Sequence, residues 1–228
     1  MGIGILTTWF APEPALVAPP PRTWQEAILG PFLEFFQRPG AMTILVFILL
    51  YKVGDSMASE MLSPFLFDLG VSKTDYAVIV KVFGMVALIG GGLIGGLVVY
   101  RWGIVPSLWV FGFLQMISTA GFAILSFVGN HLPTLTGVIA FETISSGLGQ
   151  TAFVAFMASL TNKRFTATQL ALLTSFMGLP RGFAGSTTGL LATWMGWEGF
   201  FLMCTVIALP GLLLIPRLRR LEQAPPLL

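Results

Sequence analysis

Six ionisable side chains stand inside long apolar stretches of the sequence: Lys52, Asp55, Glu60, Lys81, Glu142 and Arg181. An ionisable group near the middle of a membrane costs about 3 kcal/mol on insertion scales, so such groups usually face a protein interior or water. A carboxyl group in a dry cavity can load and unload protons at physiological pH. The acids among the six are therefore candidates for proton carriage, namely Asp55, Glu60 and Glu142.

The segment 41–67 carries three of these charges on what would be a single helix. It opens as an apolar run that is long enough to enter a bilayer. One face of an ideal helix then holds Lys52, Asp55, Ser56, Ser59 and Ser63, with Glu60 at its edge. A simple membrane anchor would keep hydrocarbon at these positions. We therefore expect this helix to line a cavity.

The composition is that of a membrane protein. Of 228 residues, 55% are hydrophobic and only 10% are charged, whereas soluble domains carry about 25% charged residues. The net charge of +2 and the absence of a basic cluster in the sequence argue against a nucleic-acid partner. The single cysteine, Cys204, cannot form an intramolecular disulfide and is expected to pack as a small apolar residue.

Six hydrophobic segments, each near or above the spanning length of about 20 residues, predict an all-α membrane protein with six transmembrane helices. They cover residues 41–66, 74–99, 104–128, 133–160, 168–194 and 198–216. Short connections separate them, and the first includes a capping box at 72–75. A tail of residues 217–228 follows.

Residues 1–40 precede this bundle. We expect residues 1–10 to be the end of a preceding helix, followed by a proline-rich linker. A capping box from Thr23 to Glu26 would open one short helix, and Pro31 would start a second. The second helix is amphipathic and suits either the membrane interface or an ordinary loop.

The loop charges predict an orientation with both termini in the cytoplasm. One side of the bundle would hold Arg22, Arg38, Arg101, Lys163, Arg164, Arg217, Arg219 and Arg220. The other side would hold only Lys73 among basic residues. Basic loop residues stay cytoplasmic under the positive-inside rule.

The charged and the glycine-rich segments repeat every three helices. Segments three and six lack interior charges, and segments two and five carry the glycines, as in the GGGLIGG string at 90–96. Two three-helix repeats explain this pattern, and matched repeats are typical of secondary transporters. The glycines would serve either close static packing or sliding of helices.

Catalytic and metal-binding functions find no support in the sequence. His131 is the only histidine and stands in a loop without a second metal ligand nearby. A nucleophile–histidine–acid set cannot be assembled around it. We therefore expect a protein that is not an enzyme and has neither a metal nor a cofactor.

The string from Gly96 through Arg101 to Gly103 resembles the cytoplasmic loop signature of the major facilitator superfamily, with Tyr100 where that family has an acid. Longer strings, among them LLYKVGDSMA at 49–58, NKRFTATQ at 162–169 and LPR at 179–181, resemble AmpG-type muropeptide permeases, a branch of that superfamily. The resemblance covers residues 22–216. It implies a proton-coupled permease of the bacterial inner membrane that imports anhydro-muropeptides for cell-wall recycling.

The same resemblance extends to only one half of such a permease, the C-terminal six helices. It implies either that this chain is a fragment of a longer permease or that it works with a partner. The partner would be an N-terminal six-helix half or a second copy of this chain. In that fold the third helix of each triplet lies away from the cavity. Acetyl-CoA or another anionic solute is an alternative substrate within this branch, and a non-transporting scaffold or truncated remnant is an alternative function.

A muropeptide carries carboxylates, so the three basic residues within the apolar segments are candidate substrate ligands, namely Lys52, Lys81 and Arg181. Arg181 is suited to bidentate binding. Each base could instead pair with a buried acid, Lys52 with Asp55 or Arg181 with Glu142. Hydrogen bonds to sugar or peptide groups are expected from Gln150, Ser146 and Thr174.

Overall fold

The computed structural model describes residues 24–38, 40–161 and 166–222, and the elements within these ranges are helices. In chain order they are α2 (Trp24–Gln37), α3 (Ala41–Asp68), α4 (Lys73–Asp75), η1 (Tyr76–Phe83), α5 (Gly84–Trp102), α6 (Ile104–Val128), α7 (Leu132–Ser159) and α8 (Thr166–Glu222). Among the described residues there is no strand, so the predicted all-α class is confirmed.

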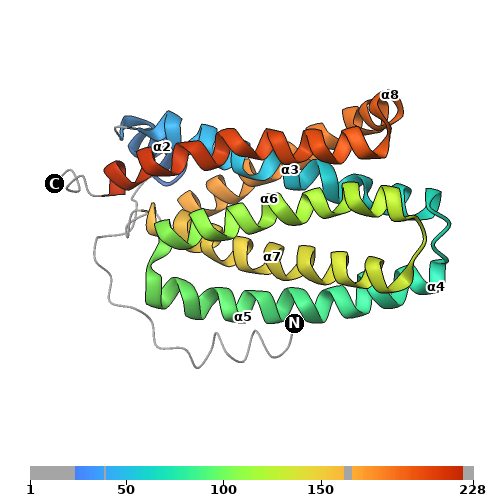
Figure 1. Cartoon of the computed structure of the whole chain (residues 1–228). Helices are drawn as coiled ribbons and strands as arrows, with labels where there is room; N and C mark the ends of the chain where they lie inside the picture. Colours follow the sequence, from blue (N-terminus) through green and yellow to red (C-terminus); the bar gives the residue numbers. More distant parts are fainter. Residues whose placement is uncertain (1–23, 39, 162–165, 223–228) are drawn as a thin grey trace.

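The long helices run back and forth beside one another (Figure 1), and glycines with positive φ stand at several of the reversals, namely Gly70, Gly103 and Gly129. α8 is interrupted at Gly196, where φ is 70° and ψ is 167°. Glycine lacks a Cβ atom and adopts this left-handed region without strain. The interruption divides α8 into two arms, residues 166–195 and 197–222, which give the fold its last two helical segments.

Helix α3 packs mainly on α8, α5 packs on α7, and α6 lies against both α7 and α8 (Figure 1). One buried cluster gathers around Phe47, Tyr51 and Phe153, and the Tyr51 and Phe153 rings stack at 5.0 Å with an interplanar angle of 5°. A second cluster, around Phe65 and Phe201, fills the other end of the bundle. These two cores hold the helices that carry the interior charges.

Within the described ranges, four stretches of helix are long and apolar enough to cross a membrane: Ala41–Asp68, Lys73–Trp102, Ile104–Val128 and Thr187–Leu218. Helix α7 has spanning length but contains many Ser, Thr and Gly residues. Spans at 133–160 and 168–194 therefore stay predictions, although both regions are helical where they are described.

Of two predicted helix starts, the one at Ser72 is confirmed and the one at Pro31 is wrong. Ser72 caps α4 as expected, since the Asp75 N–H donates to Ser72 Oγ at 3.1 Å. Pro31 does not begin a second helix but lies inside the continuous helix α2. A proline lacks the N–H that an interior position would use, yet α2 continues through it. Thr23 of the other predicted cap lies outside the described residues.

The second span begins with a π-helix, η1, which the sequence did not predict. Its eight residues, YAVIVKVF, form a plain apolar run with one lysine. Nothing in such a run distinguishes a π-helical turn from an α-helical one. π-Helical turns are rare and are often found at functional sites.

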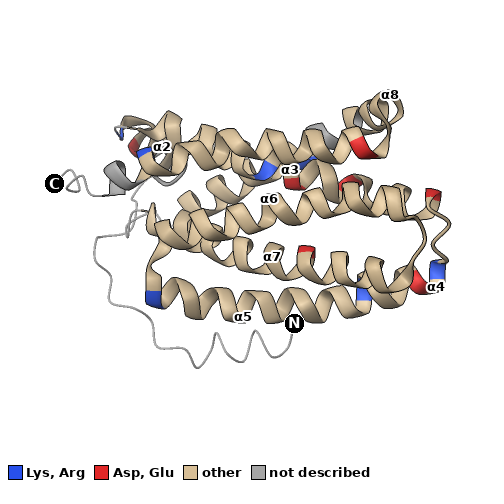
Figure 2. Cartoon of the chain, viewed as in Figure 1, with Lys and Arg blue, Asp and Glu red and all other residues tan. Residues whose placement is uncertain are grey.

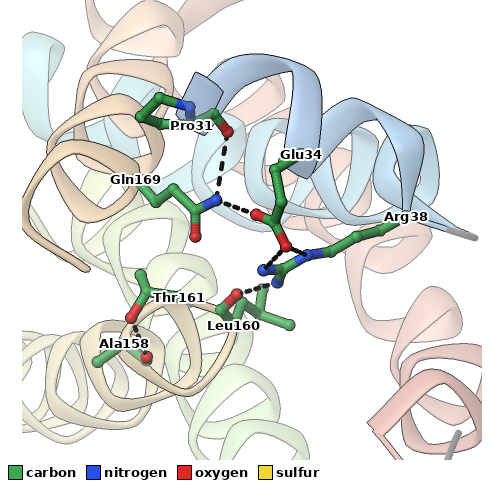
Figure 3. A network of polar contacts seen from close by, with 7 residues as sticks. All are labelled: Pro31, Glu34, Arg38, Ala158, Leu160, Thr161 and Gln169. Atoms are coloured by element: carbon green, nitrogen blue, oxygen red, sulfur yellow. Dashed lines mark hydrogen bonds and ion pairs between the residues drawn. The ribbon is translucent and has the colours of Figure 1, made fainter. Parts of the chain in front are cut away.

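Helix α2 is fastened to the ends of α7 and α8 by polar contacts (Figure 3). Arg38 Nε donates to Glu34 Oε1 at 2.9 Å, and Arg38 Nη1 donates to the carbonyl of Leu160. Gln169 Nε2 donates to the Pro31 carbonyl at 3.2 Å and also to Glu34 Oε2. This α2 network joins the helix before α3 to the connection between α7 and α8.

The apolar face of α2 divides between the core and the surface. Phe35 is buried in the first cluster, whereas Phe32, Leu33 and Phe36 are exposed. An amphipathic helix with exposed aromatic residues at the end of a membrane bundle suits the membrane interface, so that alternative remains our prediction.

Candidate functional site

The interior of the bundle holds an ion pair at the middle of α3. Lys52 is only 5% exposed, and its Nζ lies 3.0 Å from Asp55 Oδ2. The spacing of three residues places both side chains on one face of the helix. The structure thus contains the Lys52–Asp55 pairing that the sequence left open.

Two other helices contribute polar groups to this pair. Gln115 of α6 donates from Nε2 to Asp55 Oδ1 at 2.7 Å. Glu142 of α7 is 8% exposed and lies close enough for the charges of Asp55 and Lys52 to act on it. We call these four residues the Asp55 cluster; it contains two acids, one base and one amide from three helices. Figure 2 shows charges in the interior parts of α3 and α7 as well as at the helix ends.

A small cavity lies beside the cluster. Its lining residues are Tyr51, Asp55, Gly112, Gln115, Met116, Thr119, Ala208 and Leu212. It has room for about one water molecule. The Tyr51 hydroxyl donates to the Leu108 carbonyl at 3.3 Å, so the ring at the cavity wall is held by α6 as well as by Phe153.

A second ion pair connects α3 with the first arm of α8. Arg181 Nε lies 2.8 Å from Glu60 Oε1, and the two side chains are 70% and 34% exposed. The structure therefore pairs Arg181 with Glu60 instead of Glu142. Because α3 and this arm belong to different predicted repeats, the pair spans the boundary between the repeats.

An apolar cavity of about 270 Å³ lies between the same two helices. Its lining includes Leu50, Val53 and Met57 of α3 and Leu179 and Pro180 of α8. Since Pro180 is adjacent in sequence to Arg181, the ion pair lies near one edge of this cavity. The arrangement combines apolar surface with an accessible guanidinium group.

The other predicted ligands are more dispersed. Lys81 is exposed on η1, with its Nζ 5.6 Å from the centre of the Tyr76 ring. Gln150 reaches from α7 to Met177 of α8, with Nε2 4.0 Å from Sδ. Thr174 is exposed and donates to carbonyls of its own helix, and Ser146 is half-buried on α7.

Comparison with known proteins places this arrangement in a family. The family model described as Major Facilitator Superfamily matches residues 1–185. The chain belongs to the Major Facilitator Superfamily. It is a multi-pass membrane protein of a family of permeases, as the apolar helices in the described part of the chain also indicate.

Curated proteins similar to this chain come from several bacteria. The chain is 37% identical over 212 residues to the anhydromuropeptide permease of Escherichia coli strain K12, covering 92% of this chain and 43% of that protein. It is 36% identical over 193 residues to the putative transporter AmpG 4 of Rickettsia conorii, covering 85% and 47%. An uncharacterized protein of Haemophilus influenzae is 39% identical over 220 residues, covering 91% and 52%. The chain thus spans about half the length of the curated relatives it matches.

The superfamily loop motif adopts a defined turn. Gly103 has φ 87° and ψ 169°, and its N–H donates to the Val99 carbonyl at 2.9 Å, which ends α5. Arg101 is exposed in the last turn, where a cation stabilises the helix dipole. Gly96 lies inside α5, and a Cβ there would be 3.9 Å from Thr151 of α7. In this loop, only Gly103 requires glycine for its backbone conformation.

Sequence reasoning missed Gln115 as a member of the Asp55 cluster. The third segment was expected to lie away from the cavity, yet α6 contributes the amide that bonds Asp55. The sequence feature that could have indicated this residue is an amide in an apolar helix, followed within one turn by Ser118 and Thr119. Both hydroxyls donate to the Gln115 carbonyl.

Proposed function

We propose that this chain supplies one six-helix half of a proton-coupled permease that imports anhydro-muropeptides. The observation that carries the proposal is the Asp55 cluster, in which a second buried carboxyl group, that of Glu142, lies within range of the charges of the Lys52–Asp55 ion pair. The resemblance to a protein named anhydromuropeptide permease supports the substrate class. In this proposal the solute and protons enter together, which makes the protein a symporter in peptidoglycan recycling.

Charge balance explains why the cluster suits proton carriage. With both acids ionised, Lys52, Asp55 and Glu142 carry one net negative charge in a region of low dielectric. One bound proton makes the group neutral, which lowers the cost of keeping it away from water. A solute carboxylate that binds Lys52 would take the cation away from the two acids. Their negative charges would then be less compensated, so a bound proton would be more favourable. Proton and anion would then move together.

Arg181 is the proposed anion ligand at the second ion pair. Its guanidinium is 70% exposed and bound to Glu60 through Nε. A substrate carboxylate can replace Glu60 in a bidentate bond, and Glu60 can then accept a proton. Lys81, Gln150, Ser146 and Thr174 are proposed as further ligands for the sugar and peptide groups.

A second six-helix unit is part of the proposal because the chain spans about half of its relatives. The partner would be an N-terminal half or another copy of this chain. Both termini of the chain would lie in the cytoplasm, with the basic loop residues on that side of the inner membrane.

Uptake of radiolabelled anhydro-muropeptide by cells that contain the chain and its partner unit tests the function. Asp55→Asn, Glu142→Gln and Arg181→Ala are each expected to abolish uptake driven by a pH gradient, because each removes a proton site or an anion ligand. Thr136→Ala, outside the site, is the control. Unlabelled acetyl-CoA should not compete, whereas unlabelled anhydro-muropeptide should.

A scaffold without transport is the second candidate, and the pairing of Lys52 with Asp55 and of Arg181 with Glu60 favours it. In that case the charges only hold helices together. Absence of uptake by the unsubstituted chain with its partner unit would support the scaffold, whereas normal uptake by all three variants would refute the proposed roles of these residues.

A further inference from the structure

Gln115 occupies a buried position where α3, α6 and α7 meet. The residue is 5% exposed, and its Nε2 atom donates to Asp55 Oδ1 at 2.7 Å. The other carboxylate oxygen of Asp55 binds Lys52 from within α3. Gln115 therefore supplies a contact to Asp55 from a different helix.

The packing around the amide leaves space for this side chain. A Cβ atom on Gly149 of α7 would lie 2.7 Å from Gln115 Oε1. On α6 itself, a Cβ on Gly112 would lie 2.8 Å from Tyr51 Cε2 and 2.5 Å from Leu212 Cδ2. Gly149 thus leaves room for the Gln115 amide beside Asp55, and Gly112 leaves room for the Tyr51 ring.

We propose that Gln115 is a positioning residue for proton carriage, which holds the Asp55 carboxylate from α6 in the space that Gly149 provides. This inference rests on the proposed function of Asp55. The side-chain NH₂ of glutamine only donates, so it bonds best to the ionised carboxylate, and such charge-assisted bonds are about twice as strong as neutral ones. Proton binding at Asp55 would weaken the hydrogen bond from Gln115, so the contact between α3 and α6 would depend on the protonation of Asp55.

The charged and titratable groups facing Asp55 are distributed over two helices. Lys52 and Tyr51 face it from α3, and Glu142 faces it from α7. The α8 residues at the adjacent cavity are Ala208 and Leu212, which are apolar. Gln115 is a neutral, non-titrating donor to Asp55, so Gln115→Leu removes a hydrogen bond without changing the charge.

Uptake measured as a function of pH tests the functional part. Gln115→Leu is expected to lower uptake about tenfold, since a hydrogen bond to a charged group contributes on this order. Gln115→Glu keeps the shape, and its protonated carboxyl group can donate to Asp55 in place of the amide. Its uptake should recover as the external pH is lowered, whereas that of Gln115→Leu should not. Equal pH profiles for the two variants would refute the proposal.

Infrared spectroscopy of the purified chain in lipid nanodiscs tests the contact without any need for transport. The carboxyl C=O band that disappears in Asp55→Asn is assigned to protonated Asp55. In Gln115→Leu this band should move to higher frequency, because Oδ1 has lost its donor. Gly149→Ala should move it in the same direction by displacing the amide, and Gly137→Ala, where the added methyl meets open space on the same helix, should leave it unchanged.

The two measurements separate the failure of this inference from the failure of the proposed function. An unmoved Asp55 band in Gln115→Leu overturns the positioning role of Gln115, whatever the uptake. Normal uptake by Asp55→Asn overturns the proton role of Asp55 and with it the functional part of the inference. A moved band would then establish only a structural contact.

Discussion

At the scale of single residues, the two ion pairs of α3 differ in what they contribute. Lys52 and Asp55 are largely removed from solvent, with side chains 6% and 15% exposed, whereas Arg181 in the second pair is 70% exposed. A buried charge without its partner is costly, but an exposed pair adds at most about 1 kcal/mol. The inner pair therefore affects folding, and the outer pair is free to exchange partners.

The inner pair gives a prediction for stability. Lys52→Met should lower the free energy of unfolding by about 3 kcal/mol, because Asp55 keeps its charge and loses its cation. The double variant Lys52→Met, Asp55→Asn should recover most of the loss, since the neutral asparagine still accepts from Gln115. Unfolding by denaturant in detergent micelles measures both.

Glu60→Gln serves as the comparison for the outer pair. It should change the free energy of unfolding by less than about 1 kcal/mol. A loss as large as that of Lys52→Met would contradict the proposed division between the two pairs.

At the scale of helices, the glycines of α5 have separate roles on two faces. A Cβ on Gly91 would lie 2.4 Å from the carbonyl oxygen of Ile144, and one on Gly95 would lie 3.0 Å from Leu148 Cα. These backbone contacts hold α5 against α7. A Cβ on Gly90, by contrast, would meet open space. Close static packing therefore accounts for Gly91 and Gly95.

This difference predicts opposite effects for two neighbouring substitutions. Gly91→Ala should lower the free energy of unfolding by about 2 kcal/mol, because backbone atoms cannot move aside as easily as a side chain. Gly90→Ala should be neutral or stabilising by up to about 1 kcal/mol, since alanine favours the helix. Denaturant unfolding in micelles checks the pair, and an equal loss in both would show that the two faces are not distinct.

The long helices could be predicted from apolar segments and turn residues. The pairing of Lys52 with Asp55 is local, and the sequence offered it as one of two alternatives. The bond between Gln115 and Asp55 joins residues 60 positions apart, and Arg181 selects Glu60 through the placement of α8 on α3. Neither follows from spacing in the sequence. The π-helix η1 was also missed, since an apolar run gives no local signal for it.

At the scale of the whole molecule, one face of the bundle is markedly apolar and open. Only 17% of the most hydrophobic part of the Lys73–Trp102 segment is buried, and Leu93 and Val86 are among its exposed side chains. Lipid or a second set of helices can cover such a face. The proposed function requires that at least part of it contact the partner unit.

Native mass spectrometry of the chain in detergent, with and without a co-expressed six-helix partner, tests this requirement. We expect the form that supports uptake to contain two six-helix units, either two copies of 24.6 kDa or one copy with the partner. Uptake by reconstituted vesicles that contain only single copies would contradict the two-unit proposal.

The α2 network gives the molecule a mechanical property. Because Arg38 and Gln169 tie α2 to the ends of α7 and α8, α2 connects the two predicted three-helix repeats. A pull on the chain before Trp24 is delivered at the joint between those repeats as well as at the start of α3. If the proposed permease rotates one repeat against the other, a strain sensor placed in α2 is expected to respond during uptake.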